Sequence, residues 1–255
     1  MDKKVVKEYL ILTFIIMFLG WGLAAILSQT VGLNLLDSIL LKVLFVIGGF
    51  SPTIASFVVL KRNNKVKNFK EWIKSIFDVK HSLKTYALVI LFLVIYFGIG
   101  CLLNDFKLGM PIYLQFLLVI AMLFGGGNEE AGWRMILQPE LEKKFNFNIS
   151  TLITGVIWWL WHFPIFHIKG SPNETLNYLI FGVMCIALAY ALAAVRKISS
   201  GVFPCVLLHS AINSFTATFI FKFNLPSILI VLLVNVIIAN ILVYFKDKKE
   251  KDVTM

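Results

Sequence analysis

Apolar residues dominate long stretches of the chain, and polar residues gather between them. Each stretch is close to the ~20 residues that an α-helix needs to cross the roughly 30 Å hydrocarbon core of a bilayer. The pattern therefore predicts an all-α, polytopic membrane helix bundle with about eight transmembrane helices, forming a single domain over residues 1–255. The expected spans are approximately 9–28, 38–60, 85–104, 111–138, 149–168, 177–195, 201–221 and 226–245, followed by a charged tail at 246–255.

One polar connection has a helical pattern of its own. Between Asn68 and Val79, apolar residues recur at intervals of three and four, and charged residues take the opposite face. This spacing predicts an amphipathic helix that lies on the cytoplasmic membrane surface. Its apolar residues are Phe69, Trp72, Ile73, Ile76 and Phe77.

Composition agrees with the hydropathy pattern. The chain is 59% hydrophobic and has a mean hydropathy of +0.85, which excludes an ordinary soluble domain, where apolar residues make up roughly half. The net charge of +10 is spread between apolar stretches, so we expect the lipid bilayer and not nucleic acid as the partner. The three cysteines all lie in apolar stretches and indicate no disulfide framework.

The basic residues also predict an orientation. If the N-terminus is cytoplasmic, 19 of the 24 Lys and Arg residues fall in cytoplasmic segments and three fall in outside loops. The three outside residues are Lys107, Lys169 and Lys222. Lys and Arg accumulate on the cytoplasmic side of membrane proteins. We therefore expect a multi-pass cell-membrane protein with both termini in the cytoplasm.

The span at 111–138 is interrupted by charge. Glu129, Glu130 and Arg134 follow three glycines, Gly125–Gly127. Each ionisable group at bilayer depth costs roughly 2.5–3.5 kcal/mol and marks a candidate functional residue. Glu130 and Arg134 are four residues apart, so they share a helix face and can pair. Glu129 is rotated by about 100° and has no local partner, which leaves it available for proton chemistry.

Two histidines lie in other spans at a similar depth. His162 follows a tryptophan-rich run, and His209 precedes Asn213 by one helical turn. At about 1.5 Å of rise per residue, Glu129, His162 and His209 fall near one level of the bilayer. A single histidine in a membrane helix is commonly an interhelical hydrogen bonder. Together with the carboxylates, however, the two histidines predict a common site.

The residues alone leave two chemistries open. Glu129 and His162 can activate a water molecule, with His209 and Asn213 stabilising the oxyanion of a tetrahedral intermediate. Alternatively, His162, His209 and Glu129 can bind a divalent metal such as zinc and leave one position for water. The helical zinc signature HExxH is absent from the sequence.

Three short motifs in this order resemble the CAAX protease and bacteriocin-processing family of intramembrane endopeptidases. The motifs are Glu-Glu-x-x-x-Arg at Glu129–Arg134, an aromatic-x-x-x-His at Trp158–His162, and His-x-x-x-Asn at His209–Asn213. They lie in separate predicted spans and define a catalytic core of about 111–221. The family commonly has Phe where this chain has Trp158.

The resemblance implies hydrolysis of a peptide bond in a membrane-associated peptide or protein. It implies that Glu129 and His162 activate water, that His209 and Asn213 form the oxyanion site, and that Glu130 and Arg134 are structural. Members of the family have been regarded both as metalloproteases and as metal-independent glutamate proteases, so the cofactor stays open. The composition is more similar to the bacterial branch, with roles in bacteriocin immunity or peptide processing, and we do not expect a prenylated substrate.

Two other functions use the same residues. A proton-coupled transporter also needs buried carboxylates and histidines, but the chain has no repeated pair of interrupted spans. A non-catalytic immunity or scaffold protein would bind a peptide in the bilayer, and its function would survive Glu129→Ala. A protease would lose cleavage on the same substitution, and it would need no proton gradient.

Overall fold

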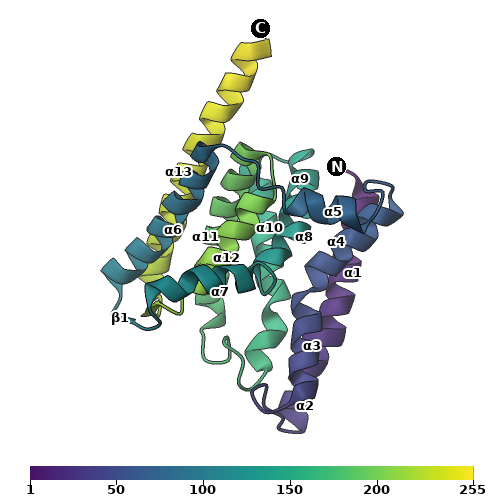
Figure 1. Cartoon of the computed structure of the whole chain (residues 1–255), viewed down its shortest axis with the longest axis vertical. Coiled ribbons are helices and arrows are strands. Elements are labelled where there is room, and N and C mark those ends of the chain that lie inside the picture. Colours follow the sequence, from purple (N-terminus) through teal and green to yellow (C-terminus); the bar gives the residue numbers. More distant parts are fainter. Residues whose placement is uncertain (255) are drawn as a thin grey trace. The chain divides into compact units, whose positions relative to one another are not determined.

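The computed structural model describes residues 1–254, and it is almost entirely helical (Figure 1). This confirms the predicted polytopic helix bundle. Within the described residues, six helical segments are long and apolar enough to cross a membrane, and a bent pair makes a seventh. The six segments are Lys3–Thr30, Leu83–Leu103, Ile112–Glu142, Phe147–His167, Tyr178–Ser199 and Leu225–Asp252.

Two of the eight predicted spans differ from the expectation. The span at 38–60 consists of two helices that meet at an angle of 47°, because Pro52 lies in the first turn of the second helix and cannot donate a backbone hydrogen bond. The span at 201–221 is a helix of only 13 residues followed by a strand. At 1.5 Å per residue this helix is roughly 20 Å long, too short to cross the hydrocarbon core alone.

The chain forms two compact units. Unit 1 contains Met1–Trp72 and Asn128–Gly182, and unit 2 contains Ile73–Gly127 and Val183–Met255. The predicted motifs are divided between them. Glu129–Arg134 and Trp158–His162 belong to unit 1, and His209–Asn213 belongs to unit 2.

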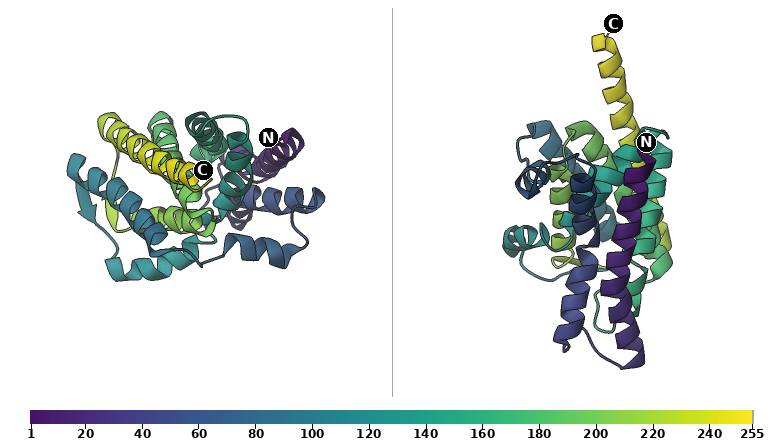
Figure 2. Two further views of the ribbon diagram at one scale, coloured as in Figure 1. Left: turned by 90° about the horizontal axis from the view of Figure 1, so that it is seen from above. Right: turned by 90° about the vertical axis from the view of Figure 1, so that its right-hand side faces the viewer.

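Unit 1 begins with a long helical segment that carries one π-helical turn. Its N-terminal elements are α1 (Lys3–Met17), η1 (Phe18–Gly22), α2 (Leu23–Thr30), α3 (Ile39–Gly49) and α4 (Ser51–Arg62). α1 runs beside α3 and α4 (Figure 2). The backbones of η1 and α3 approach closely where Gly20 meets Gly48. A Cβ on Gly20 would overlap the Gly48 backbone and lie 2.7 Å from the Leu44 carbonyl oxygen.

Asp2 caps α1 by accepting the Val5 N–H, and this hydrogen bond lowers the pKa of the Asp2 carboxyl.

The second part of unit 1 carries two of the motifs. Its elements are η3 (Gly127–Glu129), which starts at the last residue of unit 2, then α8 (Glu130–Gly132), η4 (Trp133–Leu137), α9 (Gln138–Glu142), α10 (Phe147–Trp161) and η5 (Phe163–His167). Three buried tryptophans form the core here: Trp21 and Trp161 have ring centroids 4.2 Å apart, and Trp133 meets Trp161 edge-on at 5.8 Å.

Unit 2 combines long helices with a short strand pair. Its elements are α6 (Leu83–Leu103), β1 (Phe106–Leu108), η2 (Ile112–Leu114), α7 (Gln115–Met122), α12 (Phe203–Phe215), β2 (Phe219–Phe221) and α13 (Leu225–Thr254). Most of α11 (Tyr178–Ser199) also belongs to it. β1 pairs antiparallel with β2, with Lys107 opposite Ile220. The hydropathy pattern does not predict this strand pair.

The predicted amphipathic helix is present as α5 (Phe69–Ile76), but its environment differs from the prediction. Trp72 is only 3% exposed, and its Nε1 donates to Ser56 Oγ at 3.1 Å. Ile76 is buried as well, whereas Phe69 is 57% exposed. Part of the apolar face therefore packs against protein, so its apolar residues are not all available to the membrane.

Candidate active site

The segment that carries the first motif is not a regular α-helix. After Gly125 and Gly126 the chain forms the 3₁₀ turn η3, a single α-helical turn, and then the π-helical turn η4. The glycines thus interrupt the α-helix, because glycine residues destabilise a helix interior. Single π-helical turns inside helices are found frequently at functional sites. This irregular backbone determines the direction of Glu129, which ends the 3₁₀ turn.

Glu130 and Arg134 form a buried ion pair in unit 1. Arg134 Nε lies 3.0 Å from Glu130 Oε2, and both side chains are fully buried. The four-residue spacing predicted this pair. Removing one partner of a buried pair leaves an uncompensated charge, so we expect the loss of either residue to destabilise this segment.

Glu129 has a partner from another helix. Its Oε2 accepts a 2.8 Å hydrogen bond from the indole Nε1 of Trp158 on α10, and Glu129 is 7% exposed. The sequence pattern placed Trp158 in the second motif and did not predict this contact with Glu129. Helical spacing reveals partners three or four residues apart, and these two residues are 29 positions apart.

His162 is held by the same tryptophan. Its Nδ1 lies 2.7 Å from the Trp158 backbone carbonyl oxygen. A carbonyl oxygen can only accept, so Nδ1 carries the hydrogen, and in the neutral ring Nε2 is then the acceptor nitrogen. Trp158 therefore contacts both residues, Glu129 through its side chain and His162 through its backbone. The imidazole also packs against Trp161 and Phe181, at centroid distances of 4.6 and 5.0 Å.

The N-terminal helices fix the motif segment in place. The Thr53 hydroxyl donates to the Asn128 carbonyl at 2.9 Å and accepts from the Asn128 amide at 3.0 Å. The fully buried Tyr9 from α1 touches Gly132 so closely that a Cβ there would overlap its hydroxyl. The sequence analysis did not select Tyr9, Thr53 or Asn128. The available signal was that all three are polar residues inside, or next to, predicted spans.

In unit 2, α12 presents His209 and Asn213 one turn apart. His209 is 5% exposed and Asn213 is half-buried. Gly126 lies against both residues: an added Cβ would overlap Asn213 Nδ2 and lie 4.0 Å from His209 Nε2. An added Cβ on Gly127 would overlap Ser210 Oγ and lie 2.6 Å from the Val206 carbonyl oxygen. The glycines therefore allow α12 to pack directly on this backbone.

A buried glutamine fixes α12 to α7. Gln115 is fully buried. Its Oε1 accepts from Ser214 Oγ at 2.7 Å, and its Nε2 donates to Thr218 Oγ1 at 2.5 Å. Both polar atoms of the Gln115 amide thus have a partner, Ser214 at the end of α12 and Thr218 just after it. This arrangement keeps the end of α12 in a defined position relative to α7.

A metal site requires several His, Cys, Asp or Glu side chains whose donor atoms lie close together. Among residues 1–254, no three His, Cys, Asp or Glu side chains are grouped so that they could hold an ion. Of the suggested ligands, Glu129 and His162 belong to unit 1 and His209 belongs to unit 2, and we derive no step through a metal.

The fold and these residues define a polytopic helical membrane protein with a buried, charged site. Residues 111–215, which include all three motifs, match the family model of type II CAAX prenyl endopeptidase Rce1-like proteins. The chain is also 26% identical over 179 residues to CAAX prenyl protease 2 of Methanococcus maripaludis, covering 65% of this chain and 64% of that relative. These matches agree with the resemblance that the motifs carry: over residues 111–215 the chain is similar to type II CAAX prenyl endopeptidases.

Proposed function

We propose that the protein is an intramembrane endopeptidase that hydrolyses a peptide bond in a membrane-associated peptide or protein. The observation that carries this proposal is the buried arrangement around Trp158, which holds the Glu129 carboxylate through its indole and the His162 imidazole through its carbonyl. A carboxylate and an acceptor nitrogen are the groups needed to take a proton from water. The match of residues 111–215 to an endopeptidase family supports it.

The reaction proceeds by attack of water on the peptide carbonyl. Glu129, with His162 Nε2, takes a proton from the water as its oxygen bonds to the carbonyl carbon, and the carbonyl oxygen becomes an oxyanion. His209 and Asn213 donate hydrogen bonds to that oxyanion. The tetrahedral intermediate then collapses, the carbon–nitrogen bond breaks, and the proton held by Glu129 passes to the leaving amine. Glu130 and Arg134 stay paired and keep the segment in position.

The assignment of His209 and Asn213 to this reaction is supported by their contact with Gly126. Glu129 follows Gly126 by only three residues in the sequence. A donor pair of imidazole and amide suits a developing negative charge on oxygen, because such preorganised donors need no rearrangement during the reaction.

The substrate class is proposed more broadly than the relative's name. That relative is named CAAX prenyl protease 2, whereas we propose for this chain a membrane-associated peptide or protein, in peptide processing or bacteriocin immunity. Matched peptides with and without an S-prenyl cysteine distinguish the two substrate classes.

The experiment uses the purified full-length protein in lipid nanodiscs with such peptide pairs and detects products by mass spectrometry. Glu129→Gln is expected to lower the cleavage rate by about 100-fold or more, the typical contribution of a general base. Glu174→Gln, which changes a carboxylate in a loop of the same unit that accepts the Gly170 N–H, is the matched control and is expected to cleave like the wild type. A chelator arm tests the metal alternative. Wild-type rates in Glu129→Gln would contradict the proposal.

A further inference from the structure

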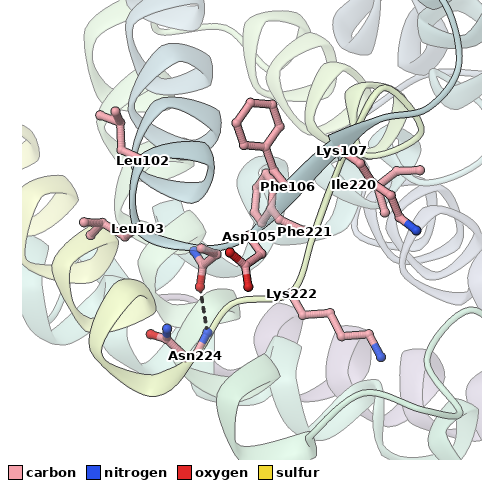
Figure 3. A pocket seen from close by; sticks show the side chains of 10 residues that line it. Leu102, Leu103, Asp105, Phe106, Lys107, Ile220, Phe221, Lys222 and Asn224 are labelled. Atoms are coloured by element: carbon pink, nitrogen blue, oxygen red, sulfur yellow. Dashed lines mark hydrogen bonds between the residues drawn. The ribbon is translucent and has the colours of Figure 1, made fainter.

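Unit 2 contains a pocket on its strand pair, formed by residues outside the motifs (Figure 3). Its volume is about 940 Å³. The lining residues come from the end of α6, from β1, from β2 and from the start of the connection to α13. They include Leu102, Asn104, Asp105, Lys107, Ile220 and Lys222.

The pocket lies where two candidate membrane spans end. α6 ends at Leu103, and α13 begins at Leu225. Leu102 and Leu103 form the end of α6, and the other pocket residues lie between this boundary and the second, at 104–107, 220–222 and 224. The ends of spans coincide with the head-group region of a bilayer, so this pocket is expected at the depth of lipid head groups.

Hydrogen bonds hold the pocket wall in a defined shape. Asn104 Oδ1 accepts from the Asn224 backbone N–H at 3.2 Å and from Ser227 Oγ at 3.0 Å, and Asn104 Nδ2 donates to the Gly100 carbonyl at 2.9 Å. The dashed line at Asn224 in Figure 3 marks the first of these bonds. Together with the β1–β2 pairing, these bonds join the two span ends. A ligand would therefore meet a preformed surface.

The charged side chains of this pocket form no ion pairs within the described residues. Lys107, Lys222 and Asp105 line the pocket, and in the part of the chain that the structure describes none of them forms an ion pair. In Figure 3 both lysine side chains extend to the same side of the strand pair. Beside them, Leu102 is 83% exposed and Leu103 is 45% exposed. Two cations, one carboxylate and an apolar border suit an amphiphile that carries a phosphate.

We propose that this pocket binds the head group of a glycerophospholipid. Lys107 and Lys222 contact the phosphate, and the acyl chains run along Leu102 and Leu103. Asp105 contacts the amine of the head group, so the pocket prefers phosphatidylethanolamine to phosphatidylglycerol. The lysine contacts supply most of the affinity, because a cation near a lipid surface interacts favourably with lipid phosphate, and the carboxylate supplies the selectivity.

The test measures lipid retention by the delipidated full-length protein, using native mass spectrometry with either lipid or with inorganic phosphate. Lys107→Gln/Lys222→Gln is expected to bind both lipids at least about tenfold more weakly, and Lys107→Arg/Lys222→Arg is expected to retain binding. Lys169→Gln removes another exposed lysine and serves as the matched control. Asp105→Asn is expected to weaken only the binding of phosphatidylethanolamine.

Three results would overturn the proposal. The first is wild-type lipid affinity in the double glutamine variant. The second is an equal loss in Lys169→Gln, and the third is binding of inorganic phosphate without retention of either lipid. An unchanged lipid preference in Asp105→Asn would overturn the assignment of Asp105. Thermal unfolding of each variant verifies that it is folded, and none of these readouts depends on peptide cleavage.

Discussion

At the scale of single residues, Trp158 determines the geometry of the carboxylate and the imidazole. Its indole donates to Glu129 at 2.8 Å, and its carbonyl accepts from His162 at 2.7 Å. The resemblance to the family predicted an aromatic residue at this position, usually Phe. Phenylalanine would keep the backbone contact with His162 and lose the hydrogen bond to Glu129. In this chain the tryptophan therefore adds a contact that a phenylalanine cannot make.

We expect Trp158→Phe to slow peptide cleavage by about tenfold or more, because a hydrogen bond to a charged group contributes roughly 1.5–3 kcal/mol. The measurement is kcat/KM on the peptide cleaved by the wild type. Trp159→Phe is the control, since the Trp159 indole donates to the Tyr178 carbonyl and not to Glu129. Equal rates for Trp158→Phe and the wild type would show that the indole does not position the carboxylate.

At the scale of elements, the glycine segment before Glu129 decides how closely α12 can pack. Gly126 and Gly127 touch Asn213, Ser210 and Val206, whereas a Cβ on Gly125 would meet its nearest neighbour at an ordinary 3.5 Å. The three glycines look equivalent in the sequence, but only two of them are required by contacts with another helix.

This difference predicts the effect of adding a methyl group. Gly127→Ala is expected to destabilise the folded protein by about 1–3 kcal/mol, the usual cost of overpacking, because the Val206 carbonyl and the Ser210 hydroxyl cannot move aside freely. Gly125→Ala is expected to change stability by less than about 1 kcal/mol. The unfolding midpoints of both variants in the same detergent provide the measurement. A Gly125→Ala variant that is the less stable of the two would contradict the packing argument.

At the scale of the whole molecule, the distribution of basic residues predicts which side of the membrane each connection occupies. The 19-to-3 division of Lys and Arg predicts cytoplasmic termini and an outside location for the strand pair β1–β2. Single-cysteine variants test this after the three native cysteines are replaced. A membrane-impermeant maleimide is expected to label Lys107→Cys in intact cells and Lys251→Cys only after permeabilisation. The reverse labelling pattern would contradict the predicted orientation.

Much of the fold could be predicted because it depends on local sequence. Hydropathy selects helices, since every backbone polar group in a bilayer must be satisfied within its own segment. This rule located the main spans correctly. It failed for residues 201–221, where an apolar run is divided between α12 and β2. Hydropathy measures apolar length, and it does not show that Phe219–Phe221 pairs with a strand more than 100 residues away.

In the candidate site, too, local sequence determines some features, and contacts between distant residues determine others. The sequence by itself determined the helical membrane class, the resemblance to an endopeptidase family and the Glu130–Arg134 pair, because hydropathy, ordered motifs and four-residue spacing all operate within short segments. Only the tertiary structure decided that Glu129 is bound by Trp158, that Trp158 orients His162, and that two span ends join in a charged pocket. The first and third of these contacts join residues far apart in the sequence. The second depends on the side-chain orientation of His162 at the end of α10, which spacing does not determine.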